Sequence, residues 1–137
     1  MKVLFDTNII LDLLLERKPF VNQAQALFEQ VESGKIEGYI GATTVTTLDY
    51  LIAKSLSIHE ARKIIKNLLK LFEIVPVNRL VLEDALDSGF SDFEDAVLHA
   101  AALHYGIQAI VTRDEKGFHK AQLAIYSPQA LLNALSL

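Results

Sequence analysis

The chain has 137 residues, of which 51% are hydrophobic and 22% charged, and this composition predicts a single globular domain over residues 1–137 rather than a disordered chain. The 13 basic and 17 acidic side chains give a formal charge of −4, which argues against a protein that coats nucleic acid by bulk positive charge. Because cysteine is absent and no apolar run reaches the roughly 18 residues of a membrane span, disulfides, thiolate zinc sites and membrane segments are excluded, and we expect a cytoplasmic protein.

The predicted elements alternate between short strands and helices. The apolar run at 2–5 (KVLF) is bounded by the polar residues 6–8 (DTN) and therefore predicts a buried parallel strand. In chain order, apolar spacing and capping residues predict helices over 9–17, 20–32, 43–55, 57–71, 78–87, 91–105 and from 127 onward, and further strands over 38–42, 73–77, 107–112 and 123–126. Strands that alternate with helices predict an α/β fold, with a parallel sheet covered by helices on both faces.

The charged residues are unevenly distributed along the chain. Between Lys54 and Arg79 there are six basic residues and two acids, whereas 80–112 holds six acids and neither Lys nor Arg. Both segments fit solvated helix faces of opposite sign. The basic segment also contains a stripe at helical spacing that would suit contact with a phosphate backbone, formed by Lys63, Lys66 and Lys70.

Four aspartates stand where open parallel sheets bind ligands. Asp6 and Asp114 each follow the carboxyl end of a predicted buried strand, and these strands, the first and fourth, are often neighbours in doubly wound sheets. Asp92 and Asp95 share the first turn of a helix that a capping-box pattern at 91–94 (SDFE) opens. Carboxylates gathered in one cleft repel one another unless cations bind, and oxygen ligands without cysteine favour Mg²⁺ or Mn²⁺ and phosphoryl chemistry.

Other polar residues are better explained without a ligand. Glu94 suits a helix N-terminus through the capping box and the helix dipole alone, whereas for Asp92 this explanation and a role at the site are equally favoured. The four histidines lack metal-type spacing, and we expect His99 and His104 to pack or hydrogen-bond beside an alanine-rich helix face. No nucleophile elbow, P-loop or GxGxxG motif is present, so that a nucleotide cofactor is not expected.

Three motifs together resemble the PIN-domain family of metal-dependent nucleases, which includes the VapC-type toxins of toxin–antitoxin pairs. The matching segments are 5–12 (FDTNIILD), 92–96 (DFEDA) and 110–114 (IVTRD). The resemblance covers essentially the whole chain and implies a three-layer α/β/α sandwich with a short central parallel sheet. It further implies dependence on Mg²⁺ or Mn²⁺, endonucleolytic cleavage of RNA, homodimerisation and control by an antitoxin partner.

The resemblance also implies roles for individual residues. By role, these are catalytic metal ligands (Asp6, Asp95, Asp114), a further acid that binds metal directly or through water (Asp92), and residues that support the site (Thr7, Asn8, Thr112). Arg113 immediately precedes Asp114, and its position fits contact with a substrate phosphate.

One position departs from the family's pattern. Many members carry a glutamate early in the helix after the second strand, where this chain has Thr47. Asp49 lies about 200° further around the helix and is expected to point elsewhere. Loss of that carboxylate would weaken a metal site, which leaves open a non-catalytic RNA-binding or protein-interaction module. A haloacid-dehalogenase-like phosphatase is disfavoured, because Asn8 stands where that family needs a second aspartate.

Overall fold

The computed structural model describes residues 1–136 and contains a five-stranded parallel sheet in the order β3-β2-β1-β4-β5. The strands are β1 (Lys2–Phe5), β2 (Glu37–Gly41), β3 (Glu73–Val75), β4 (Ala109–Val111) and β5 (Ala124–Tyr126). The helices are α1 (Thr7–Leu14), α2 (Val21–Glu32), α3 (Ala42–Ser55), α4 (Ile58–Leu71), α5 (Arg79–Asp87), α6 (Phe93–His104), the short 3₁₀-helix η1 (Glu115–Phe118) and α7 (Pro128–Leu135). Within this described part of the chain, no helix is long and apolar enough to cross a membrane.

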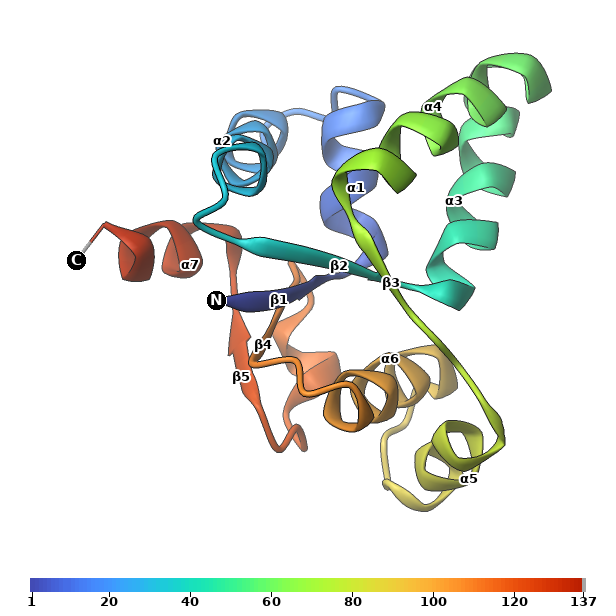
Figure 1. Ribbon diagram of the computed structural model, residues 1–137, viewed down its shortest axis with the longest axis vertical. Helices are drawn as coiled ribbons and strands as arrows, with labels where there is room; N and C mark the ends of the chain where they lie inside the picture. Colours follow the sequence, from blue (N-terminus) through green and yellow to red (C-terminus); the bar gives the residue numbers. More distant parts are fainter. Residues whose placement is uncertain (137) are drawn as a thin grey trace.

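Helices cover both faces of the sheet (Figure 1), and successive strand residues point to opposite sides of it. Along β1, Val3 and Phe5 belong to a core shared with α1 to α4 and α7, whereas Leu4 belongs to a second core shared with α5, α6 and η1. The predicted α/β/α layering is therefore confirmed, and the central strand segments 3–5 and 109–111 are entirely apolar because both of their faces are buried.

The strand order reverses at β1, which pairs with β2 on one side and with β4 on the other. The chain builds β1, β2 and β3 outward in one direction and then crosses to place β4 and β5 on the opposite side. Such a reversal leaves a gap between crossover connections at the carboxyl ends of the two central strands, where open α/β sheets bind their ligands. This edge is where Asp6 and Asp114 follow their strands.

The starts of two helices differ from the prediction by two residues. Helix α1 begins at Thr7 rather than at residue 9 and is capped by Asp6. Helix α6 begins at Phe93 rather than at residue 91 with Asp92 as its cap, so the predicted capping box at 91–94 was wrong. An aspartate caps a helix as well as a serine does, and local patterns do not decide between adjacent candidates. Helices α4, capped by Ser57, and α7, capped by Ser127, begin where the predicted ranges 57–71 and 127 onward place them. Strand β1 has the predicted bounds, β2 is shifted by one residue, and β3, β4 and β5 are shorter than predicted; η1 was not expected.

Candidate active site

The carboxyl ends of β1 and β4 bring distant parts of the chain together. Phe5 pairs with Val111, and the next residue, Asp6, donates its backbone N–H to the Val111 carbonyl at 3.0 Å. The prediction that the first and fourth strands are neighbours is confirmed. As a consequence, the turn after β4, residues 112–114, lies against the start of α1.

Asp6 is buried, with 7% of its surface exposed, and both of its carboxylate oxygens accept hydrogen bonds. One oxygen accepts the Thr7 N–H at 2.8 Å, and the other accepts the Thr112 hydroxyl at 2.8 Å. The Thr112 oxygen in turn accepts the backbone N–H of Asp114 at 2.9 Å. Burial raises the pKa of Asp6 against the lowering effect of these hydrogen bonds, and the charges of Asp114 and Asp92 raise it further.

Asp95 and Asp114 approach each other at Gly117, the third residue of η1. A Cβ atom added to this glycine would lie 2.8 Å from the Oδ2 atom of Asp114 and 2.8 Å from that of Asp95, so the two oxygens are no more than twice that distance apart. A side chain at 117 would therefore fill the space between the carboxylates. Burial raises the pKa of Asp95 to about 7, and the charges of Asp6, Asp92, Asp114 and Glu94 add to this effect.

The structure thus gathers Asp6, Asp95 and Asp114 into one group of mutually repelling carboxylates. Asp92 adjoins this group from the N-terminus of α6, where it is exposed and accepts the backbone N–H of Asp95 at 2.9 Å. Asn8 supports the turn after β4, because its side-chain oxygen accepts the N–H of Arg113 at 3.3 Å. Each sequence-predicted carboxylate therefore lies at the same edge of the sheet.

Three buried threonine hydroxyls at this edge have no hydrogen-bond partner in the described residues: Thr7, Thr43 and Thr44. Thr7 follows Asp6, and the other two begin α3 directly after β2, the strand beside β1. An unpaired buried hydroxyl costs roughly 1–3 kcal/mol, which makes a concentration of them unusual outside sites that bind water or a ligand.

The residues present fit a hydrated divalent cation. The donors are all carboxylate and hydroxyl oxygens, which suit Mg²⁺ or Mn²⁺ rather than zinc. Besides burial, the charges of Asp92 and Asp114 raise the pKa values of Asp6 and Asp95, as anions without a counter-charge do. No group of three or more acidic or histidine side chains within residues 1–136 has the geometry to hold an ion in this arrangement. Binding one cation through several of these carboxylates would thus require a different arrangement of their side chains.

Helix α3 contributes hydroxyls but no carboxylate to this edge. Thr47, at the position of the family's usual glutamate, donates its hydroxyl to the Thr43 carbonyl at 3.3 Å and is half-buried. Asp49 forms an ion pair with Arg62 of α4 at 3.0 Å, which confirms the prediction that it points elsewhere.

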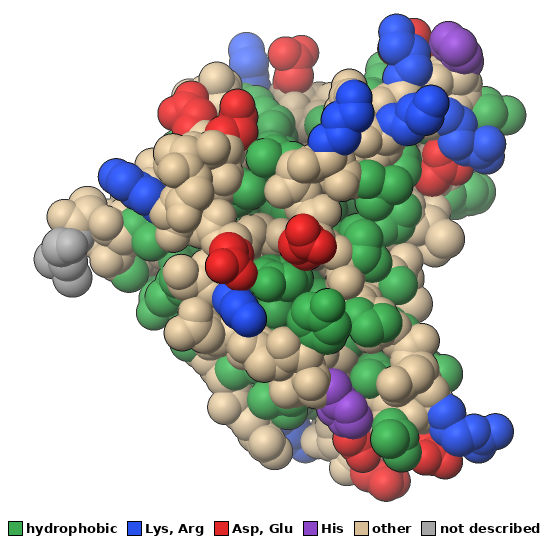
Figure 2. All heavy atoms as spheres, viewed as in Figure 1, with side chains coloured by type: hydrophobic (Ala, Val, Ile, Leu, Met, Phe, Trp, Pro, Cys, Tyr) green, Lys and Arg blue, Asp and Glu red, His purple; other side chains and the backbone are tan. Residues whose placement is uncertain are grey.

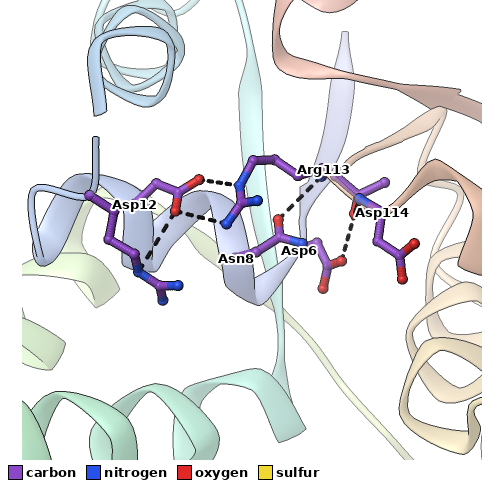
Figure 3. Close-up of polar contacts among 7 residues, drawn as sticks. Asp6, Asn8, Asp12, Arg113 and Asp114 are labelled. Atoms are coloured by element: carbon purple, nitrogen blue, oxygen red, sulfur yellow. Dashed lines mark hydrogen bonds and ion pairs between the residues drawn. The ribbon is translucent and has the colours of Figure 1, made fainter. Parts of the chain in front are cut away.

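The predicted RNA contacts separate into two groups. Lys63, Lys66 and Lys70 are exposed on α4, where Lys and Arg side chains gather on the surface (Figure 2). Arg113 behaves differently, because two of its guanidinium nitrogens bond to the buried carboxylate of Asp12 (Figure 3). A guanidinium held in this internal pair is poorly placed to bind a substrate phosphate, and we do not retain Arg113 as an RNA contact.

Sequence reasoning assigned no role to Asp12, although this residue lies in the segment 5–12 that resembles the PIN-domain family. The available signal was a charged residue inside the apolar segment 9–15 (IILDLLL), since an aspartate is almost never buried without a partner. The histidines behave as predicted: His99 is buried and accepts the N–H of Gln122, and His104 pairs with Asp84.

A family model described as PIN domain matches residues 2–116, and the chain therefore belongs to the PIN-domain family. Among curated proteins, the chain is similar to Ribonuclease VapC1 of Aquifex aeolicus (strain VF5), with 24% identity over 133 residues that cover 93% of this chain and 91% of that protein.

Solved structures share the fold over almost the whole chain. A toxin–antitoxin complex from Klebsiella pneumoniae contains a chain with a TM-score of 0.69 and 22% identity, covering 92% of this chain and 97% of that one. VapBC-1 from nontypeable Haemophilus influenzae has a TM-score of 0.72 and 16% identity, covering 94% and 99%. These likenesses confirm the predicted PIN-like sandwich.

Proposed function

We propose that this protein is a metal-dependent endoribonuclease that cleaves RNA phosphodiester bonds and acts as the toxin of a toxin–antitoxin pair. The observation that carries the proposal is the group formed by Asp6, Asp95 and Asp114 at the point where strand order reverses. The curated relative is named a ribonuclease, and a structural neighbour comes from a toxin–antitoxin complex, which supports this reading over a non-catalytic module. We further propose a single cytoplasmic domain over 1–137 that forms a homodimer.

In this proposal the three aspartates hold Mg²⁺ or Mn²⁺, directly or through water, and Asp92 adds a fourth carboxylate. The ion supplies a Lewis acid and a water of lowered pKa for attack on phosphorus. Thr112 fixes the orientation of Asp6 through its hydroxyl, and Thr7 does so through its backbone N–H. Asn8 holds the turn that carries Asp114.

The proposal is tested by incubating the purified protein with a 5′-labelled RNA in Mg²⁺, in Mn²⁺ and in EDTA. We expect internal cleavage that requires a divalent ion and is lost in Asp95→Asn. Tight RNA binding without cleavage in either ion would favour the non-catalytic module. Hydrolysis of a small phosphomonoester that survives Asp95→Asn would instead indicate a phosphatase.

Thr47→Glu should strengthen the site, because α3 now places no carboxylate at this edge. A glutamate at 47 adds one negative charge and two oxygen ligands, and we expect Mn²⁺ to bind about tenfold more tightly, equivalent to about 1.4 kcal/mol. Isothermal titration with Mn²⁺ measures the change. Thr46→Glu is the matched control, because Thr46 is the exposed neighbour on the same helix. Equal effects of the two variants would show that position 47 does not face the ion.

The basic stripe on α4 should contact the RNA backbone. Neutralising Lys63 and Lys66 together as glutamines should weaken RNA binding and reduce the slope of log affinity against log salt by about 1.4, or roughly 0.7 for each phosphate contact to a single strand. Fluorescence anisotropy with a labelled RNA at several salt concentrations measures this slope. The control removes the exposed Lys2 and Lys35 as glutamines, which gives the same net charge at the opposite edge of the sheet. Equal slopes in both variants would exclude a specific role for α4.

A further inference from the structure

Asp12 of α1 and Arg113 of the turn after β4 form an ion pair that joins residues 101 positions apart (Figure 3). The pairing is bidentate: one Asp12 oxygen accepts a hydrogen bond from Nε of Arg113 at 2.6 Å, and the other accepts one from Nη2 at 3.2 Å. Asp12 is only 1% exposed, and Arg17 approaches the same carboxylate at 3.7 Å. A buried carboxylate is therefore matched by two guanidinium groups.

The face of the Arg113 guanidinium is held as well as its edge. Its central carbon lies 3.7 Å from the centroid of the Phe20 ring, a distance at which cation and ring attract each other. The planar fork of an arginine suits this combination of paired hydrogen bonds and stacking, which a lysine cannot reproduce. Arg113 consequently has a single fixed orientation.

The backbone around Arg113 is tied to the same helix. Its N–H donates to the Asn8 side chain, and the preceding residue, Thr112, donates its hydroxyl to Asp6 and accepts the N–H of Asp114. The turn 112–114 is thus attached to the start of α1 by its first residue and to the middle of α1 by the Arg113 side chain. Asp114 projects from the end of this doubly anchored turn.

We propose that the Asp12–Arg113 pair, backed by Phe20, is a positioning clamp that keeps the turn carrying Asp114 beside Asp6, so that both carboxylates can bind the same metal centre. The inference rests on the proposed metal-dependent function and makes Arg113 a positioning residue rather than a ligand of RNA. A buried ion pair adds little net stability compared with apolar residues of similar volume, so its value lies in the geometry that it imposes.

For Arg113→Gln, the loss of charge and the loss of positioning predict opposite changes in Mn²⁺ affinity, so this variant gives a decisive test. Arg113→Gln removes a positive charge near a site for a cation, and by electrostatics alone Mn²⁺ would bind more tightly. If the residue positions Asp114, Mn²⁺ instead binds more weakly. We expect five- to tenfold weaker binding in Arg113→Gln and in Asp12→Asn, measured by isothermal titration of the metal-free protein with Mn²⁺. Equal or tighter binding in folded Arg113→Gln would overturn the proposal.

Removing one partner of a buried pair also destabilises a protein strongly, so two further variants leave no unpaired charge. Arg113→Lys keeps the charge but loses the bidentate geometry, and Phe20→Leu changes no charge. Both variants should weaken Mn²⁺ binding about threefold. Circular dichroism should show that both remain folded. Wild-type affinity in both would overturn the clamp.

The controls break an exposed aspartate–arginine pair elsewhere on the molecule. Asp49→Asn and Arg62→Gln disrupt the exposed pair between α3 and α4, and Mn²⁺ affinity should be unchanged. A weakening equal to that of Arg113→Gln would assign the effect to general destabilisation and overturn the proposal.

If the wild-type protein binds no Mn²⁺, the proposed function itself fails and the clamp fails with it. If the wild type binds Mn²⁺ and Arg113→Gln binds it with equal affinity, the proposed function stands and only the clamp is wrong.

Discussion

Asp6→Asn should abolish Mn²⁺ binding and reduce RNA cleavage by at least about a thousandfold without unfolding the protein. Asparagine keeps the size of the side chain, and its carbonyl oxygen still accepts one of the two hydrogen bonds that Asp6 receives from Thr7 and Thr112. What the substitution removes is the negative charge at the centre of the carboxylate group. The measurements are isothermal titration with Mn²⁺ and cleavage of a labelled RNA.

The same variant should make the metal-free protein more resistant to unfolding. Asp6 is buried and lies in the field of Asp92 and Asp114, both of which raise its pKa, so a neutral side chain relieves a repulsion. Asp87→Asn, which removes one exposed acid from the end of α5, is the control for charge alone. A folded Asp6→Asn protein that binds Mn²⁺ like the wild type would contradict the assignment of Asp6.

The metal-free protein should lose stability as the pH rises, and Asp95 should account for much of the loss. The pKa of this carboxyl is about 7 in the folded protein, whereas its ordinary value is 3.8. Between these values the folded protein holds a proton that the unfolded chain has released, so the stabilising contribution is complete below pH 4 and disappears as the pH passes 7. Because Asp95 is partly screened by solvent, we expect a difference of about 2 kcal/mol in the free energy of unfolding.

Urea denaturation of the metal-free protein at pH 5 and at pH 8 measures this contribution. The fall in unfolding free energy between the two values should be smaller by about 1 kcal/mol in Asp95→Asn than in the wild type, because part of the loss occurs below pH 5. Saturating Mn²⁺ should restore the wild-type stability at pH 8, because binding to the folded state alone adds about 2.7 kcal/mol at 100 times the dissociation constant. An identical pH dependence in the two proteins would show that Asp95 does not experience the other carboxylates.

Local signals in the sequence predict most of the fold. Short apolar runs and helical spacing locate five strands and seven helices, and a cap such as Ser57 follows from its own neighbourhood. The ends of elements are less determined, since Ser91 and Asp92 are both good caps and only packing selects Asp92. The 3₁₀-helix η1 cannot be predicted from the sequence, because its four residues show no periodic hydrophobic pattern.

Some residues of the site can likewise be predicted from local sequence signals, and others cannot. Asp6 and Asp114 are predictable because each follows a recognisable strand, and the rule for parallel sheets then places them together. The pairing of Asp12 with Arg113 is not predictable, because it depends on how α1 and the turn after β4 meet across 101 residues. Arg113 was assigned to RNA for the same reason: its position in the sequence shows nearness to Asp114 but not the direction of its side chain.

The central claim, that Asp6, Asp95 and Asp114 hold the metal of an RNA-cleaving site, is tested most directly by locating Mn²⁺ in a crystal soaked with the ion, through its anomalous scattering. We predict a peak between these three carboxylates, and the loss of that peak in Asp6→Asn crystals treated in the same way. A Mn²⁺-saturated crystal with no peak at this edge of the sheet, or with its peak elsewhere on the molecule, would contradict the account.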